Sequence, residues 1–152
     1  MAKKKKVSIK NVKFGKGVKI IEPVNLYGCE IGKNCFIGPY VEIQNNVYIG
    51  DNTRISSHSF ICELVKIGNG CFISHGVMFT NDLFKSGTLE KNSHKFLPTK
   101  IGNNVLIGSN STILPVNIVS GCIIGAGSVV TKDLSKKGIY VGNPAKFVRK
   151  IS

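Results

Sequence analysis

The chain has 152 residues, of which 42% are hydrophobic and 19% are charged, and its formal net charge is +13. This length and composition fit one soluble, compact unit and exclude collagen-like, disordered and membrane-spanning classes. Residues 1–20 hold eight lysines, and residues 132–150 hold five lysines and one arginine, whereas residues 21–131 carry seven basic and seven acidic residues. The positive charge therefore belongs to the two ends, which are either solvated tails or sites that attract a phosphate-bearing ligand or nucleic acid.

The five cysteines are odd in number and form no CxxC pair, so the sequence predicts neither a disulfide framework nor a metal site. They are interpreted as small buried hydrophobic residues in a reducing compartment. The lysine-rich start leads into no apolar signal segment, and a cytoplasmic location is the expectation.

Residues 14–81 carry a hydrophobic residue at nearly every sixth position, often followed by glycine. The series contains Phe14, Ile20, Leu26 and, after one five-residue unit, Ile31, Ile37, Ile43, Ile49, Ile55, Ile61, Ile67, Ile73 and Phe79. A period of six fits neither an α-helix nor a long alternating strand, because each unit holds one inward side chain, a few extended residues and a turn. Three units make one triangular coil of about 18 residues, and stacked coils bury the isoleucines as a column.

The polar residues 82–100 have no hexad phase and are predicted to loop out, and loops of this length in a compact domain are often functional. Residues 101–131 return to the hexad. Residues 132–152 leave it again, which predicts a short C-terminal cap over the last coil. We therefore predict an all-β chain, a parallel β-helix with coils over residues 14–81 and 101–131, in a single domain over residues 1–152.

The tandem [Ile/Leu/Val]-Gly-x-x-x-x units resemble the hexapeptide-repeat acyltransferases. This resemblance alone implies that the β-helix is left-handed, because ordinary crossover geometry favours right-handed connections. Residues 75–82, HGVMFTND, resemble bacterial N-acetyltransferases that act on dTDP-linked 3-amino-3,6-dideoxyhexoses, and residues 124–133 and 141–146 resemble the acyl-CoA-binding end of the superfamily. The resemblance implies transfer of an acetyl group from acetyl-CoA to the amino group of a nucleotide-linked amino sugar by a homotrimer, without nucleic-acid or membrane partners.

The 18-residue coil places three polar residues, Asn45, Glu63 and Asn81, in one row along one corner of the prism. A carboxylate beside amides can orient an amine for attack on a thioester, or the row can be a ladder that satisfies backbone groups of the corner. His75 is a candidate general base but equally a structural histidine, and in related enzymes the departing thiolate can take the proton. The catalytic candidates are therefore Glu63, His75 and Asn81.

Substrate binding is assigned to four polar residues: Asn45, His58, Asp82 and Lys85. Cofactor binding is assigned to three kinds of residue. Small residues let pantetheine approach the backbone, polar residues lie next to them in the sequence, and cations can bind the CoA phosphates. This set contains Gly108, Gly125, Ala126, Gly127, Thr131, Lys132, Asn143, Pro144, Lys146 and Arg149. A solubilising basic cap is the alternative for the cations.

The Ser–His neighbours at 57–58 and 74–75 are not expected to form a nucleophile pair, because successive residues on a strand point to opposite faces. Direct transfer in a ternary complex is predicted instead. Two other functions stay open: O-acetyl transfer to another small acceptor, and noncatalytic binding of a polyanion by the lysine-rich ends.

Overall fold

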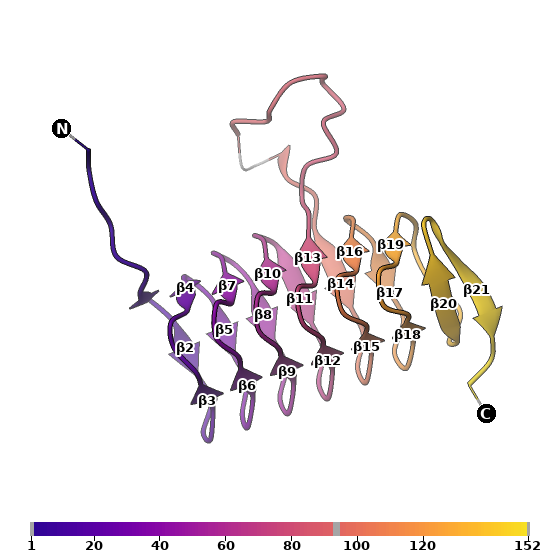
Figure 1. Cartoon of the computed structure of the whole chain (residues 1–152), viewed down its shortest axis with the longest axis horizontal. Helices are drawn as coiled ribbons and strands as arrows, with labels where there is room; N and C mark the ends of the chain where they lie inside the picture. Colours follow the sequence, from indigo (N-terminus) through magenta and orange to yellow (C-terminus); the bar gives the residue numbers. More distant parts are fainter. Residues whose placement is uncertain (1, 93–94, 152) are drawn as a thin grey trace.

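The computed structural model describes residues 2–92 and 95–151 and forms a triangular stack of short strands from which one loop projects (Figure 1). Each strand of the coils belongs to the sheet after that of the strand before it. A strand therefore pairs with the strands three before and three after it in the chain, as β4 does with β1 and β7. No helix in the described part of the chain is long and apolar enough to cross a membrane.

Three sheets form the faces of the prism. Sheet A contains β1 (Ile9–Lys10), β4 (Asn25–Tyr27), β7 (Glu42–Ile43), β10 (Phe60–Ile61), β13 (Met78–Phe79), β16 (Thr112–Ile113) and β19 (Val129–Val130). Sheet B contains β2 (Lys13–Phe14), β5 (Glu30–Ile31), β8 (Tyr48–Ile49), β11 (Val65–Ile67), β14 (Thr99–Ile101) and β17 (Asn117–Ile118). Sheet C contains β3 (Lys19–Ile20), β6 (Phe36–Ile37), β9 (Arg54–Ile55), β12 (Phe72–Ile73), β15 (Leu106–Ile107), β18 (Ile123–Ile124), β20 (Ile139–Gly142) and β21 (Ala145–Arg149). All pairs are parallel except the pair of β20 with β21.

The hydrophobic series forms the core that the period of six predicts. Ile37 pairs with Ile55 and Ile55 with Ile73, so equivalent residues of successive coils stand side by side. Ile37, Ile43 and Ile55 are completely buried. The fold agrees with the predicted left-handed parallel β-helix that has one excursion loop and a C-terminal cap.

The glycine that follows many of the core residues is required by the close stacking of coils. A Cβ atom at Gly50 would lie 2.6 Å from the carbonyl carbon of Gly68 in the next coil. At the same corner, side-chain oxygens cap backbone N–H groups of the coil before: Asp51 accepts from Lys33 at 2.7 Å, and Asn69 accepts from Asp51 at 2.8 Å. Small residues and Asx side chains therefore hold the coils together where the chain turns.

The boundaries differ from the predicted ones in three places. The first strand begins at Ile9, before the predicted start at residue 14. Ile9 pairs with Leu26 on one side only and is 39% exposed, so this end of the stack shows the buried hexad pattern only weakly. Strand β14 begins at Thr99, inside the predicted loop. The cap is an antiparallel hairpin of β20 and β21, which the loss of the hexad did not reveal.

The excursion leaves the stack after β13 and returns at β14 (Figure 1). Its base is closed by the backbone N–H of Leu97, which donates to the carbonyl of Asn81 at 2.8 Å. The two carboxylate oxygens of Asp82 accept from the N–H groups of Phe84 at 2.8 Å and Glu90 at 3.2 Å. These bonds fold the loop back on itself beside sheet A.

The buried thiols predict a loss of stability in alkali. Burial raises the pKa of Cys62 from 9.0 to about 12 and that of Cys29 to about 11, and burial also raises the pKa of the other three thiols. Unfolded thiols ionise first, so the stabilising difference is complete below pH 9.0 and is lost as the pH rises toward 12. We expect the urea midpoint, measured with reductant present, to fall steadily above pH 9.0, and to fall less steeply in Cys62→Ala. A midpoint that is independent of pH in this range would contradict the burial of the thiols.

Candidate functional site

The base of the loop and the turns from sheet A to sheet B, here called corner AB, enclose a cavity of about 520 Å³. Its polar wall contains Asn45, Glu63 and Asn81, and its apolar wall contains Phe60 and Phe84. A few polar groups in a largely apolar hollow of this size are typical of small-molecule sites.

The structure brings together the predicted polar row. The Asn45 Nδ2 atom donates to Glu63 Oε1 at 3.2 Å, and the backbone N–H of Glu63 donates to the side chain of Gln44 at 3.3 Å. Asn81, on the next coil, lines the same cavity where the loop begins. The Glu63 carboxylate is therefore held in place by the neighbouring coil, with Asn81 on its other side.

Two further residues of this cavity were not singled out from the sequence. The Thr80 hydroxyl is buried and has no hydrogen-bond partner among the described residues. Tyr27 stands 18 positions before Asn45, and burial, followed by the charge of Glu42, raises the pKa of its phenol. Because the coil before Asn45 contains the five-residue unit and has 17 residues, Tyr27 stacks on Gln44, and subtraction of 18 residues does not give this neighbour.

The assigned loop residues have different surroundings. Asp82 holds loop backbone groups with both carboxylate oxygens, so its contacts are structural. Lys85 is exposed and lines a second, smaller cavity of about 250 Å³ together with Asn81.

The two histidines of the coils lie at the opposite edge of sheet A, in the turns from sheet C to sheet A, here called corner CA. His75 Nδ1 is 2.9 Å from the Ser57 hydroxyl, and the ring of His58 stacks on Tyr40 with centroids 4.9 Å apart. The Ser57–His75 pair comes from successive coils, which the inspection of adjacent Ser–His pairs overlooked. In the tautomer whose Nδ1–H donates to the Ser57 hydroxyl, the other ring nitrogen of the exposed His75 keeps a lone pair that can accept a proton.

A single chain keeps His75 away from the polar row. His75 and Asn81 are six positions apart across sheet A, and this segment, which begins in the turn at Gly76, spans at most roughly 20 Å. The three catalytic candidates thus form two half-sites on opposite edges of one face.

Four of the ten assigned cofactor residues, Gly108, Gly125, Ala126 and Gly127, lie in the corner that carries His75. The backbone N–H of Asn110 donates to the His75 carbonyl at 2.9 Å, and the N–H of Gly127 donates to the Ser109 carbonyl at 2.8 Å, so corner CA runs unbroken to Ala126. Ala126 and Gly127 are exposed there.

The cofactor residues other than Ala126 and Gly127 fall in three groups. A Cβ at Gly108 would collide with the backbone of the next coil, and one at Gly125 would lie 2.8 Å from Val141, so both glycines serve packing. Asn143 and Pro144 turn the hairpin beside corner CA, and the exposed Lys146 and Arg149 follow on β21. Thr131 and Lys132 instead follow β19, across sheet A at corner AB.

Among residues 2–92 and 95–151, no group of three or more His, Cys, Asp and Glu side chains is placed to hold a metal ion.

Family models match both halves of the coil stack. The model described as bacterial transferase hexapeptide (six repeats) matches residues 28–63, and the model described as hexapeptide repeat of succinyl-transferase matches residues 98–132. Both halves of the coil stack therefore match models of hexapeptide repeats. This hexapeptide-repeat protein is 53% identical over 55 residues to a Staphylococcus aureus protein provisionally named an acetyltransferase, and the match covers 36% of this chain and 28% of the relative. The chain thus spans under a third of the relative's length.

Solved structures share the fold of the hexapeptide-repeat protein. AntD, an N-acyltransferase from Bacillus cereus in complex with dTDP and coenzyme A, is 24% identical with a TM-score of 0.78, over 95% of this chain and 86% of AntD. GDP-perosamine N-acetyl transferase from Caulobacter crescentus, in complex with CoA and GDP-perosamine, is 18% identical with a TM-score of 0.64, over 93% and 57% of the two chains. A maltose O-acetyltransferase from Clostridium difficile is 24% identical with a TM-score of 0.61, over 95% and 70%. At these identities the likeness establishes the β-helix.

Proposed function

We propose that this protein is an N-acetyltransferase that transfers the acetyl group of acetyl-CoA to the amino group of a nucleotide-linked amino-deoxy sugar, of the dTDP-3-amino-3,6-dideoxyhexose class. The observation that carries this proposal is the Asn45–Glu63–Asn81 row in the cavity beneath the loop. A carboxylate fixed by a neighbouring amide attracts and orients an amine, whereas a sugar hydroxyl does not need this charge.

The reaction is a direct transfer. Asn81 and Glu63 orient the amine, whose nitrogen attacks the thioester carbonyl; the carbon–nitrogen bond forms, the carbon–sulfur bond breaks and CoA leaves as the thiolate. The proton of the amine passes to the free ring nitrogen of His75 or to the departing sulfur. Cys62 lines the same cavity, but burial raises its pKa to about 12, so it is no nucleophile near neutral pH.

Acetyl-CoA is placed along corner CA, where Ala126 and Gly127 offer exposed backbone two coils beyond His75. The pantetheine arm lies along this edge with its thioester toward His75, and Asn143 and Pro144 border its other end. Lys146 and Arg149 on β21 meet the phosphates.

A homotrimer unites the two half-sites. Neighbouring prisms bring corner CA of one subunit opposite corner AB of the next, which closes the distance that separates His75 from Asn81 within one chain. The outer face of sheet C supports this assembly, because Phe36, Arg54, Phe72 and Leu106 stand in one row there. The Arg54 guanidinium lies 4.0 Å over the Phe36 ring, and Leu106 is 41% exposed, so the row offers a mixed aromatic, cationic and aliphatic surface. Sedimentation showing an active monomer would exclude the trimer.

The test of the function is an acceptor panel. The protein is incubated with acetyl-CoA and dTDP- or UDP-linked amino sugars, their hydroxyl counterparts, and free sugars, and products heavier by one acetyl group are sought by mass spectrometry. Acetylation of a linked amino sugar alone supports the proposal. Acetylation of hydroxyl acceptors alone would identify an O-acetyltransferase, and no product with any acceptor would reject transfer.

Ser57 is expected to position His75 rather than to act as a nucleophile. Because Ser57 contacts Nδ1 at 2.9 Å, Ser57→Ala should leave the ring free to rotate and lower kcat by about tenfold, less than His75→Ala does. Ser57→Thr, which keeps the hydroxyl, should restore most of the loss. The pH dependence of kcat separates this role from a structural one: the acidic limb of the unsubstituted enzyme should persist in Ser57→Ala and vanish in His75→Ala.

The basic hairpin should act on cofactor binding. Replacement of Arg149 and Lys150 by Ala removes two exposed cations and is expected to raise KM for acetyl-CoA several-fold while KM for the sugar stays nearly unchanged. Steady-state kinetics with each substrate varied in turn measures both constants. Equal changes in both would indicate a general effect on stability.

A further inference from the structure

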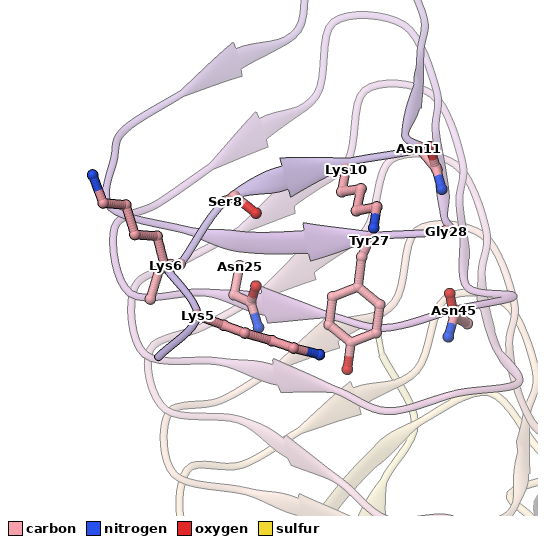
Figure 2. Close-up of a pocket in the computed structure, with 10 residues that line it drawn as sticks. Lys5, Lys6, Ser8, Lys10, Asn11, Asn25, Tyr27, Gly28 and Asn45 are labelled. Atoms are coloured by element: carbon pink, nitrogen blue, oxygen red, sulfur yellow. The ribbon is translucent and has the colours of Figure 1, made fainter. Parts of the chain in front are cut away.

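A wide hollow lies at the first coils of sheet A, beneath the lysine-rich N-terminal segment. It has a volume of about 930 Å³, and its lining includes Lys5, Lys10, Asn25, Tyr27 and Asn45. Figure 2 shows Lys5 and Lys10 extending toward Tyr27, whereas Lys6 points away from it. Two lysines of the strongly charged end thus meet over one polar patch of the β-helix.

The position of Lys10 is fixed by the coil beneath it. Lys10 belongs to β1, and its carbonyl accepts from the N–H of Gly28 at 3.0 Å, while the carbonyl of Ser8 accepts from Leu26 at 3.1 Å. The segment that carries Lys5 enters this strand directly. These bonds hold Lys10 on the stack, and Lys5 lies three residues before the first bonded carbonyl, that of Ser8.

This hollow adjoins the cavity at the loop, because Tyr27 and Asn45 line both, and the two together are here called the groove. The combined groove is charged in opposite senses at its two ends. Lys5 and Lys10 stand over the first two coils, whereas the carboxylate of Glu63 follows on the fourth. On the third coil, the Glu42 carboxylate is outside the lining of both hollows and accepts from Asn25 and Gln44 at 3.0 Å each.

We propose that the lysine end of this groove binds the phosphate part of the acceptor, so that the substrate lies along sheet A with its phosphates at Lys5 and Lys10 and its amine at Glu63. Three strand spacings separate β1 from β10, which amounts to roughly 14 Å. A lysine side chain and the pyranose of a phosphate-linked sugar together bridge this distance. The ligand class that matches both ends is a phosphorylated or nucleotide-linked amine, held by charge-assisted hydrogen bonds.

The identity of the amine end rests on the proposed function, but the phosphate end is testable by binding alone. The probes are dTDP and CoA, titrated separately into the protein by calorimetry. Both ligands carry phosphates, but only the phosphates of dTDP should bind to Lys5 and Lys10. The variant pair Lys5→Ala/Lys10→Ala is compared with Lys4→Ala/Lys16→Ala, which removes the same charge from residues that do not line the groove.

We expect the first pair to weaken dTDP binding by about tenfold or more and the control pair by less than about twofold, with CoA binding unchanged in both. Equal weakening by both pairs, no weakening, weakening of CoA in place of dTDP, or no measurable binding of dTDP by the unsubstituted protein would each overturn the assignment. If dTDP binding depends on Lys5 and Lys10 but no acceptor is acetylated, the phosphate site stands and the proposed transfer fails. If linked amino sugars are acetylated with the same KM in both pairs, the transfer stands and this site is wrong.

Discussion

Ile67→Asp is expected to abolish soluble folding. Ile67 is 1% exposed and stands between Ile49 and Ile101 of the two neighbouring strands, β8 and β14. A carboxylate there would be enclosed by aliphatic side chains. The substitution forfeits about 2 kcal/mol of hydrophobic burial and adds several kcal/mol for an unpaired buried charge. The free energy of unfolding of a domain is about 5–15 kcal/mol, so this loss, together with the interrupted packing of the isoleucine column, should prevent folding. Soluble yield and thermal unfolding measure the effect.

The neighbouring position provides the control. Lys66 lies on the same strand but points outward and is exposed. Lys66→Asp introduces the same side chain one residue away and should give a soluble protein whose melting temperature changes by only a few degrees. Ordinary thermal stability of Ile67→Asp would mean that the assigned inward register of β11 is incorrect.

Asn81→Ala should lower the rate of acetyl transfer by about 100-fold, which corresponds to about 2.7 kcal/mol of lost transition-state stabilisation. The reason is positional: Asn81 lines the cavity beside Glu63, and the loss of its amide leaves the amine without one of its orienting groups. Folding should survive, because the contact that closes the loop base uses the Asn81 backbone carbonyl, which alanine retains. Steady-state kinetics with the acceptor identified by the panel provides the measurement.

Two further variants define what the row does. Glu63→Gln keeps the size of the side chain and its contact with Asn45 and should reduce the rate less than Asn81→Ala if the carboxylate only orients the amine, and more if it also receives the proton. Asn117→Ala, at an exposed position of sheet B, is the matched asparagine control and should leave the rate unchanged. Near-normal rates in both Asn81→Ala and Glu63→Gln would mean that the chemistry takes place at another corner of the prism.

The sequence is sufficient for the architecture because one local rule repeats. Each hexad contributes one buried residue such as Ile43 or Ile61, and the 18-residue coil then determines which residues become neighbours, as the bond between Asn45 and Glu63 illustrates. The rule fails where the repeat ends. The hairpin of β20 and β21 pairs antiparallel through contacts that no periodicity encodes.

The site was only partly predictable for a related reason. The 18-residue coil length predicts the polar row, because its members occupy equivalent positions in successive coils. Ser57 and His75 are also 18 residues apart, but the Ser–His pairs that are adjacent in sequence do not indicate this contact. The loop has no repeat at all, so nothing in the sequence showed that both carboxylate oxygens of Asp82 are engaged by loop backbone. Nor does a run of lysines disclose that Lys5 and Lys10, but not Lys4, line a groove.

The excursion interrupts the chain but not the stack. Val65 pairs with Thr99 and Ile67 with Ile101 as though the loop between β13 and β14 were absent, so the sheets carry no trace of its length. The loop residues that line the cavity, such as Phe84 and Leu89, are consequently encoded apart from the paired residues of the coils. Insertions, deletions and substitutions in the loop can therefore change what the cavity admits while the coil scaffold stays constant.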